Sequence, residues 1–195
     1  VIAPLLVPLI GGILLVLLGG SATPLRRTVS MIAIQALFGV SLVLLLLVWD
    51  GTILVYQAGN WPAPFGIVLV ADRLSAAMVF LTSVLALFAM LHAVKGSDRS
   101  GRQFHVLFQF QLLGLNGAFL TGDLFNLFVA FEVVLVASYL LIQIPGSDRS
   151  LQAAFPNVAI NQLASLLFLV AVGLLYGQHG TVNLADLAVR LAESP

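Results

Sequence analysis

The chain has 195 residues, of which 61% are hydrophobic and 8% are charged, with eight basic and eight acidic side chains and no cysteine. Soluble domains carry roughly 25% charged residues, so this much apolar surface calls for lipid as its solvent, and zero net charge does not favour a nucleic-acid-binding surface. The absence of cysteine excludes disulfides, thiol nucleophiles and iron–sulfur ligation from this sequence, and its three scattered histidines do not suggest a metal site.

Six apolar runs are suited to crossing a bilayer as helices, which takes about 20 residues rising about 1.5 Å each. Their expected limits are residues 2–20, 29–49, 72–94, 104–120, 124–144 and 154–176. Asp72 opens the third run and Asp123 precedes the fifth, and short acidic side chains are typical N-caps. We therefore expect an all-α integral membrane protein with about six transmembrane helices, in a single transmembrane domain over residues 1–195.

About twenty residues between the second and third runs do not fit a helix. Two short β-type stretches, residues 53–56 and 67–70, flank the sequence Gly-Asn-Trp-Pro-Ala-Pro-Phe-Gly at 59–66, which has the composition of a turn. We expect a short β-hairpin lying on the membrane surface. The stretch from residue 183 to 193 is polar enough to lie at the interface as well.

The basic residues predict the orientation of the chain. Two of them fall on the side of the N-terminus, Arg73 and Arg190, and six fall on the opposite side: Arg26, Arg27, Lys95, Arg99, Arg102 and Arg149. Because cytoplasmic loops carry the excess of Lys and Arg, we expect cytoplasmic basic loops and an extracytoplasmic N-terminus and hairpin. The sequence Gly-Ser-Asp-Arg-Ser occurs twice on the basic side, at 96–100 and 146–150, and is interpreted as two similar loop sequences rather than a repeat.

Glu132 is the residue most informative about function, because it lies near the middle of the fifth run, between Phe131 and Val133. A charged side chain at the bilayer centre costs at least about 2.5–3.5 kcal/mol, and such residues usually mark ion or proton pathways. Desolvation favours the protonated acid and a nearby cation favours the charged one, so the group can load and release a proton. The alternative is a protonated glutamate that only joins two helices by a hydrogen bond.

Several other side chains are candidates for supporting a proton path: Phe131, Asn116, Asn161, Ser165 and His105. Asn161 and Ser165 are four residues apart and share a helix face, while His105 opens the fourth run on the basic side. Each polar candidate taken singly is explained better by helix packing than by a role in a proton path. Asp123 lies nine residues before Glu132, half a turn around the helix, so the two carboxylates do not form a dyad.

The sequence Leu-Thr-Gly-Asp-Leu-Phe-Asn-Leu-Phe-Val-Ala-Phe-Glu at 120–132 resembles the signature of the D subunit of Mrp-type cation/proton antiporters. Residues 59–67 resemble the outer hairpin of that family, and residues 174–177 and 180–183 resemble the end of its sixth helix. The family is homologous to the antiporter-like subunits of respiratory complex I and of membrane-bound hydrogenases. The resemblance implies a multi-pass protein of a prokaryotic cell membrane with about fourteen helices and two inverted repeats, of which this chain is the N-terminal portion.

The resemblance also implies that Glu132 matches the family's essential glutamate and works as a proton carrier with lysines on later helices. Family members often have a basic residue near the start of helix six, where this chain has Phe155-Pro156-Asn157, so the resemblance does not carry the family's relay step over to this point, and the role expected of Glu132 is unaffected.

The expected function is that of a proton-translocating subunit of a multi-subunit monovalent cation/proton antiporter, with sodium as the expected cation. We expect a transporter subunit rather than an enzyme, with no cofactor and with other membrane subunits as its partners. Two alternatives stay open. One is a proton-pumping membrane-arm subunit of a quinone-linked NADH dehydrogenase or hydrogenase, and the other is a non-transporting scaffold subunit.

Overall fold

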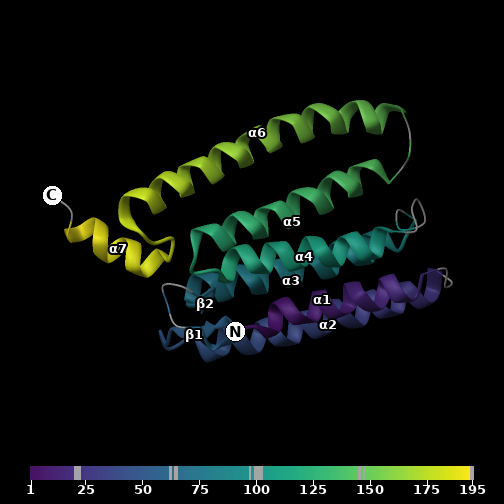
Figure 1. The fold of residues 1–195 in the computed structure, drawn as a ribbon. Coiled ribbons are helices and arrows are strands. Elements are labelled where there is room, and N and C mark those ends of the chain that lie inside the picture. The colour runs from purple at the N-terminus through teal and green to yellow at the C-terminus, as the bar shows by residue number, and fades with distance from the viewer. Residues whose placement is uncertain are drawn as a thin grey trace.

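The structure is a computed structural model that describes residues 1–19, 23–61, 63, 66–96, 98, 103–144, 146 and 148–193. The elements in chain order are α1 (Ala3–Leu17), α2 (Thr23–Leu47), β1 (Leu54–Gln57), the 3-10 helix η1 (Ala58–Asn60), β2 (Val68–Ala71), α3 (Arg73–Ala93), α4 (Phe104–Leu120), α5 (Leu124–Gln143), α6 (Asp148–His179) and α7 (Leu184–Glu193). Helices α1 to α6 form an elongated bundle in which successive helices run in opposite directions (Figure 1).

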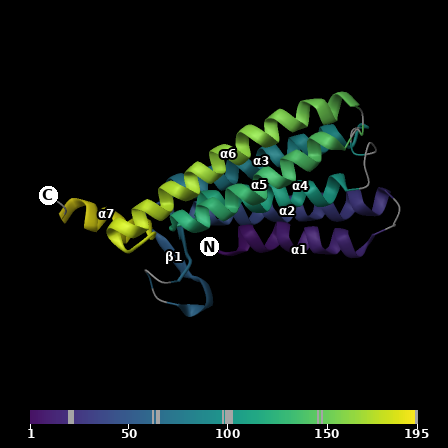
Figure 2. The same cartoon turned by 45° about the horizontal axis from the view of Figure 1, so that its top comes forward.

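The two ends of the bundle differ. The hairpin end holds the N-terminus, β1, β2 and α7, and the loop end is where α1, α3 and α5 finish and α2, α4 and α6 begin (Figures 1 and 2). Helix α4 is central and packs against α1, α3 and α5, whereas α6 lies at the edge of the bundle against α5. Glu132 belongs to α5 and Ser165 to α6, so the two residues lie on helices that pack against each other at this edge of the bundle.

Four helical segments of the described chain are long and apolar enough to cross a membrane: α2, α3, α5 and residues 154–179 of α6. Helices α1 and α4 are also apolar but have only 15 and 17 residues. Helix length and composition thus support a multi-pass membrane protein with four clear spans and do not by themselves confirm the expected count of six.

Two helices begin earlier than the sequence predicted. Helix α2 starts at Thr23 instead of residue 29, and α6 starts at Asp148 instead of 154 and continues to His179 instead of 176. Each early start adds polar residues, among them Arg26 and Arg27, that were assigned to connections because they are too polar for lipid. Arginine is a good helix former, so a helix extends beyond its apolar span; the other helix limits lie within three residues of those expected.

The hairpin expected between the second and third helices is present, with β1 and β2 antiparallel and Leu54 opposite Ala71. Its tip includes Pro62, Pro64 and Phe65, which lie outside the described residues. The turn before α5 joins the hairpin to the start of α7, since the Gly122 nitrogen donates to the Val68 carbonyl at 2.8 Å and the Gly122 carbonyl accepts from Leu184 at 2.9 Å.

Both predicted N-caps are confirmed. Asp72 accepts a hydrogen bond from the Ser75 backbone nitrogen at 2.7 Å, and Ser75 Oγ accepts one from the Asp72 backbone nitrogen at 2.9 Å. Asp123 accepts from the Asn126 backbone nitrogen at 2.8 Å. Each cap pairs a backbone donor that the first helical turn otherwise leaves unpaired, so Asp123 has a structural role in starting α5.

Asn116 links α4 to α1 by a hydrogen bond to a backbone carbonyl that lacks its usual donor within α1. Pro8 lies inside α1 and has no N–H, so the carbonyl of Pro4 lacks the donor usually found four residues further on. Asn116 supplies a substitute, because its Nδ2 donates to the Pro4 oxygen at 2.9 Å in a fully buried position.

We expect Asn116→Leu to destabilise the full-length protein by about 1–3 kcal/mol, because the buried Pro4 carbonyl loses its donor. In a Pro8→Ala background the penalty should be smaller, since alanine at this position restores the N–H within α1. Thermal unfolding of the four variants of this double-mutant cycle in detergent measures the coupling. The same penalty in both backgrounds would contradict the assigned role of Asn116.

Candidate functional site

Glu132 is the ninth residue of α5 and faces α6, where the buried Ser165 hydroxyl donates a hydrogen bond to Glu132 Oε1. A hydroxyl can donate to a carboxylate and can also accept from a protonated carboxyl group. The pair can therefore persist in both protonation states of the glutamate, which is what a site that loads and releases protons requires.

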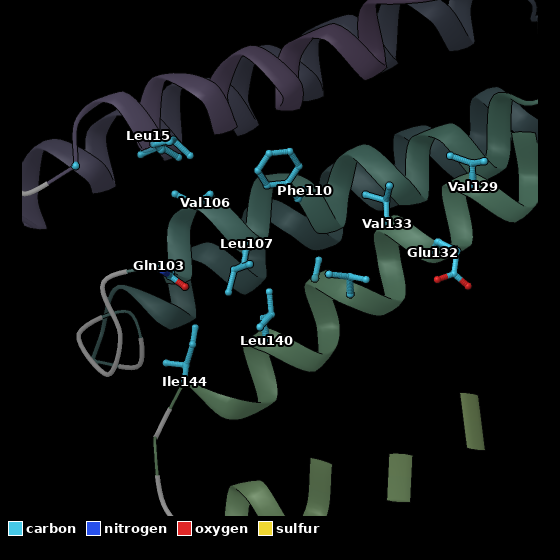
Figure 3. A pocket seen from close by; sticks show the side chains of 14 residues that line it. Leu15, Gln103, Val106, Leu107, Phe110, Val129, Glu132, Val133, Leu140 and Ile144 are labelled. Atoms are coloured by element: carbon cyan, nitrogen blue, oxygen red, sulfur yellow. The ribbon is translucent and has the colours of Figure 1, made fainter. Parts of the chain in front are cut away.

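An apolar groove of about 970 Å³ begins at Glu132 and runs between α1, α4 and α5 to Gln103 and Ile144 at the loop end (Figure 3). Apart from Glu132 and Gln103, all of its lining residues are apolar. The groove leaves free space beside Glu132 but offers few hydrogen-bonding groups along its length.

Three of the other predicted site residues lie with Glu132 at the interface of α5 and α6. Ser165 is its direct partner. Asn161 is one turn of α6 away, and its Nδ2 donates to Asn157 Oδ1 at 2.9 Å. Phe131 packs edge-on against Phe168 of α6 with 6.3 Å between the ring centroids, so its contact is with α6 rather than with a polar group.

The structure does not bring Asn116 or His105 to Glu132. Gly114 and Gly117 of α4 face α5, whereas Asn116 bonds to Pro4 of α1. His105 is buried at the loop end, with its Nε2 atom 3.4 Å from Asp98 Oδ2. Asn116 is next to Gly117 on α4 and therefore points in a different direction, and His105, three turns earlier on α4, lies on nearly the same face as Asn116.

Asp98 is a buried residue that the sequence reasoning missed, because it lies in the Gly-Ser-Asp-Arg-Ser stretch interpreted as a loop. Arg27 of α2 donates to both of its carboxylate oxygens, from Nε to Oδ2 and from Nη2 to Oδ1, the latter at 2.6 Å. These hydrogen bonds hold the pKa of Asp98 below its usual range. The pair ties α2 to the segment that leads into α4.

We expect Asp98→Asn to lower the thermal stability of the full-length protein at neutral pH, by roughly 1.5–3 kcal/mol for a charge-assisted hydrogen bond. A lowered folded-state pKa means that the stabilisation is complete above the unfolded value near 3.9 and is lost as pH falls through the folded value. The difference from wild type should therefore shrink below about pH 4. Unfolding followed from pH 7 to pH 3 measures it.

A matched control is Asp186→Asn, which breaks an exposed ion pair with Arg190 at 3.1 Å in α7. Exposed pairs contribute little, so this variant should be much closer to wild type. A difference between Asp98→Asn and wild type that stays constant across the pH range would refute the assignment.

Tyr139 was also missed, although its position seven residues after Glu132 in the sequence places it on the same face of the helix. It is 8% exposed and lies at the interface with α6 near Asn161. A search for polar residues spaced by seven from Glu132 would have found it.

The family described as NADH:quinone oxidoreductase/Mrp antiporter, TM, matches residues 121–193, which include Glu132 and Ser165. With the bundle of apolar helices, this match supports a multi-pass membrane protein similar to the membrane subunits of that family. Over 98% of its length the chain is 46% identical to the D subunit of a probable K(+)/H(+) antiporter of Rhizobium meliloti (strain 1021), and over 99% it is 45% identical to the D subunit of the Na(+)/H(+) antiporter of Alkalihalophilus pseudofirmus. The chain is therefore similar to Mrp-type antiporter D subunits over nearly its whole length, as its motifs at 59–67 and 120–132 suggested.

Solved structures agree with this assignment. The Mrp complex from Dietzia sp. DQ12-45-1b contains a chain with a TM-score of 0.87 and 32% identity, matched over 97% of this chain and 39% of that one. The archaeal membrane-bound sulfane sulfur reductase gives a TM-score of 0.88 at 27% identity, over 95% and 39% of the two chains. Respiratory complex I from Thermus thermophilus gives 0.81 at 26%, over 97% and 39%. The chain spans 36% and 39% of the length of the two D-subunit relatives.

Proposed function

We propose that this chain is part of a proton-translocating membrane subunit of a multi-subunit monovalent cation/proton antiporter, with Glu132 as the proton carrier. The observation that carries the proposal is an acidic side chain in the middle of the apolar helix α5, hydrogen-bonded to Ser165 of α6. The D-subunit relatives support the transport class, and intramembrane acids commonly mark proton pathways.

In the proposed cycle Glu132 takes up a proton from one side of the membrane and becomes neutral, which suits its apolar surroundings. A cation that approaches the carboxyl group then favours the charged form, so the proton leaves towards the other side. Throughout, Ser165 keeps a hydrogen bond to the carboxyl group. A proton that crosses the membrane potential gains about 2.3 kcal/mol per 100 mV, which can drive a cation in the opposite direction.

We propose that the loop end is cytoplasmic and the hairpin end extracytoplasmic. Arg26, Arg27 and Lys95 of the described chain lie towards the loop end, in keeping with the excess of basic residues in cytoplasmic loops. Sodium is the proposed cation, following the relative from A. pseudofirmus, but the relative named for potassium is equally similar in sequence. A direct comparison of the two cations is therefore part of the test.

The test is proton flux in proteoliposomes that contain the assembled complex with the full-length subunit and an imposed pH gradient. Adding sodium should dissipate the gradient faster than adding potassium. A gradient that neither cation affects would contradict antiport. The second candidate function is a redox-driven proton pump, because the chain also resembles complex I and the sulfane sulfur reductase. Co-purification with flavin or iron–sulfur subunits would support this second candidate over the antiporter.

A further inference from the structure

A row of polar side chains leads from Glu132 towards the loop end along the interface between α5 and α6. Asn157, Asn161 and Ser165 recur at every fourth position of α6 and so share one face. Ser165 pairs with Glu132, and because the two helices run in opposite directions, Asn161 and Asn157 lie successively nearer to the loop end. Tyr139, two turns after Glu132 on α5, lies at their level.

The Tyr139 hydroxyl is the incomplete member of this row. It is buried and interacts with Asn161, yet among the described residues it makes no hydrogen bond of good geometry. Asn161 already donates to Asn157. Buried polar groups are nearly always paired with protein or with ordered water, so a water molecule between Tyr139 and the two asparagines would complete the pairing of this hydroxyl.

The groove and the interface between α5 and α6 both extend from Glu132 towards the loop end, and they differ in polarity. The groove between α1, α4 and α5 presents only apolar side chains between Glu132 and Gln103 (Figure 3), and an apolar surface offers a proton no acceptor. The interface between α5 and α6 presents hydroxyl and amide groups at successive turns from Ser165 to Asn157. Over this part of the route, hydrogen-bonding groups favour the second path.

We propose that Tyr139, together with Asn157 and Asn161, is a positioning residue that holds water between Glu132 and the loop end, and that protons reach or leave Glu132 along this row. Tyr139 stays neutral: when its O–H passes a proton to a neighbouring oxygen, the hydroxyl oxygen takes one from the water on its other side. No group changes its charge permanently, so the step balances. This inference rests on the proposed role of Glu132 as proton carrier.

The decisive variant is Tyr139→Phe, which keeps the ring and removes only the hydroxyl. In the full-length, assembled complex we expect cation-dependent proton flux to fall about tenfold, the effect of losing one hydrogen bond in the transfer path. Replacing H₂O by D₂O should slow this variant more than wild type, because proton transfer becomes the limiting step. A purely structural defect would leave the isotope effect unchanged, and an unchanged isotope effect overturns the proposal.

Two control variants share the chemistry of this substitution. Tyr176→Phe makes the same change at a tyrosine of α6 that is 57% exposed, and Ser138→Ala removes a neighbouring hydroxyl that donates to the Leu135 carbonyl of its own helix at 2.9 Å. Both should transport like wild type. If Tyr139→Phe lowers the amount of assembled protein, Asn161→Leu tests the same row and should show the same loss of flux and the same isotope effect.

The outcome separates the two levels of the proposal. Tyr139→Phe with normal flux, alongside Glu132→Gln with none, overturns the proposed water path and leaves Glu132 as the carrier. Normal flux in Glu132→Gln overturns the proposed function and the path with it.

Discussion

Glu132→Gln is expected to abolish cation-dependent proton flux while the complex still assembles. The amide has nearly the same shape as the carboxyl group and can still accept the hydrogen bond from Ser165. It cannot bind and release a proton at cellular pH, so the carrier step is lost while packing at the interface between α5 and α6 is kept. The measurement is proton flux in proteoliposomes, together with the yield of assembled complex.

Stability distinguishes a carrier from a packing contact. A neutral side chain within the membrane costs less than a charged one, so we expect the melting temperature of Glu132→Gln to equal or exceed that of wild type. Glu193→Gln is a matched control, since it makes the same substitution at an exposed position in α7 and should leave flux unchanged. Loss of assembly in Glu132→Gln, with flux per assembled complex unaffected, would instead support the scaffold alternative.

Gly114→Ala should weaken the contact between α4 and the helix that carries Glu132. A Cβ atom at Gly114 would lie 2.6 Å from Val134 Cγ2 and 2.9 Å from both the Ala130 oxygen and the Val134 nitrogen. Two of these three atoms are backbone and cannot move away independently of α5. We expect a loss of about 1–3 kcal/mol, typical of overpacking, visible as a lower melting temperature of the full-length protein.

The control for this substitution is Gly39→Ala in α2, where a Cβ atom meets nothing within 4 Å. Alanine is the better helix former by up to about 1 kcal/mol, so this variant should match or slightly exceed wild type in stability. Equal destabilisation by the two substitutions would show that the effect at Gly114 does not come from the α4–α5 contact.

Local patterns in the sequence were sufficient for several features. Apolar runs located the six main helices because lipid exposure imposes one simple requirement over about 20 residues. The N-caps at Asp72 and Asp123 depend on neighbours three residues away, and the hairpin strands pair within one short stretch of the chain; all were found. Glu132 could be identified because the free-energy cost of an ionisable side chain in an apolar helix follows from the sequence, without knowledge of its partners. The predicted starts of α2 and α6 were too late because both helices begin with polar residues that precede the apolar runs.

The partners of the polar residues were decided by tertiary structure alone. Three contacts join residues that are far apart in the sequence. Arg27 and Asp98 are separated by 71 positions, Asn116 and Pro4 by 112, and Glu132 and Ser165 by 33. These contacts depend on how each helix is rotated about its axis, and helices that are apolar on nearly all sides carry little periodic signal that specifies the rotation. The sequence by itself therefore determined which segments form apolar helices and that one acid lies in the middle of one of them, while close packing of the helices decided which side chains that acid faces.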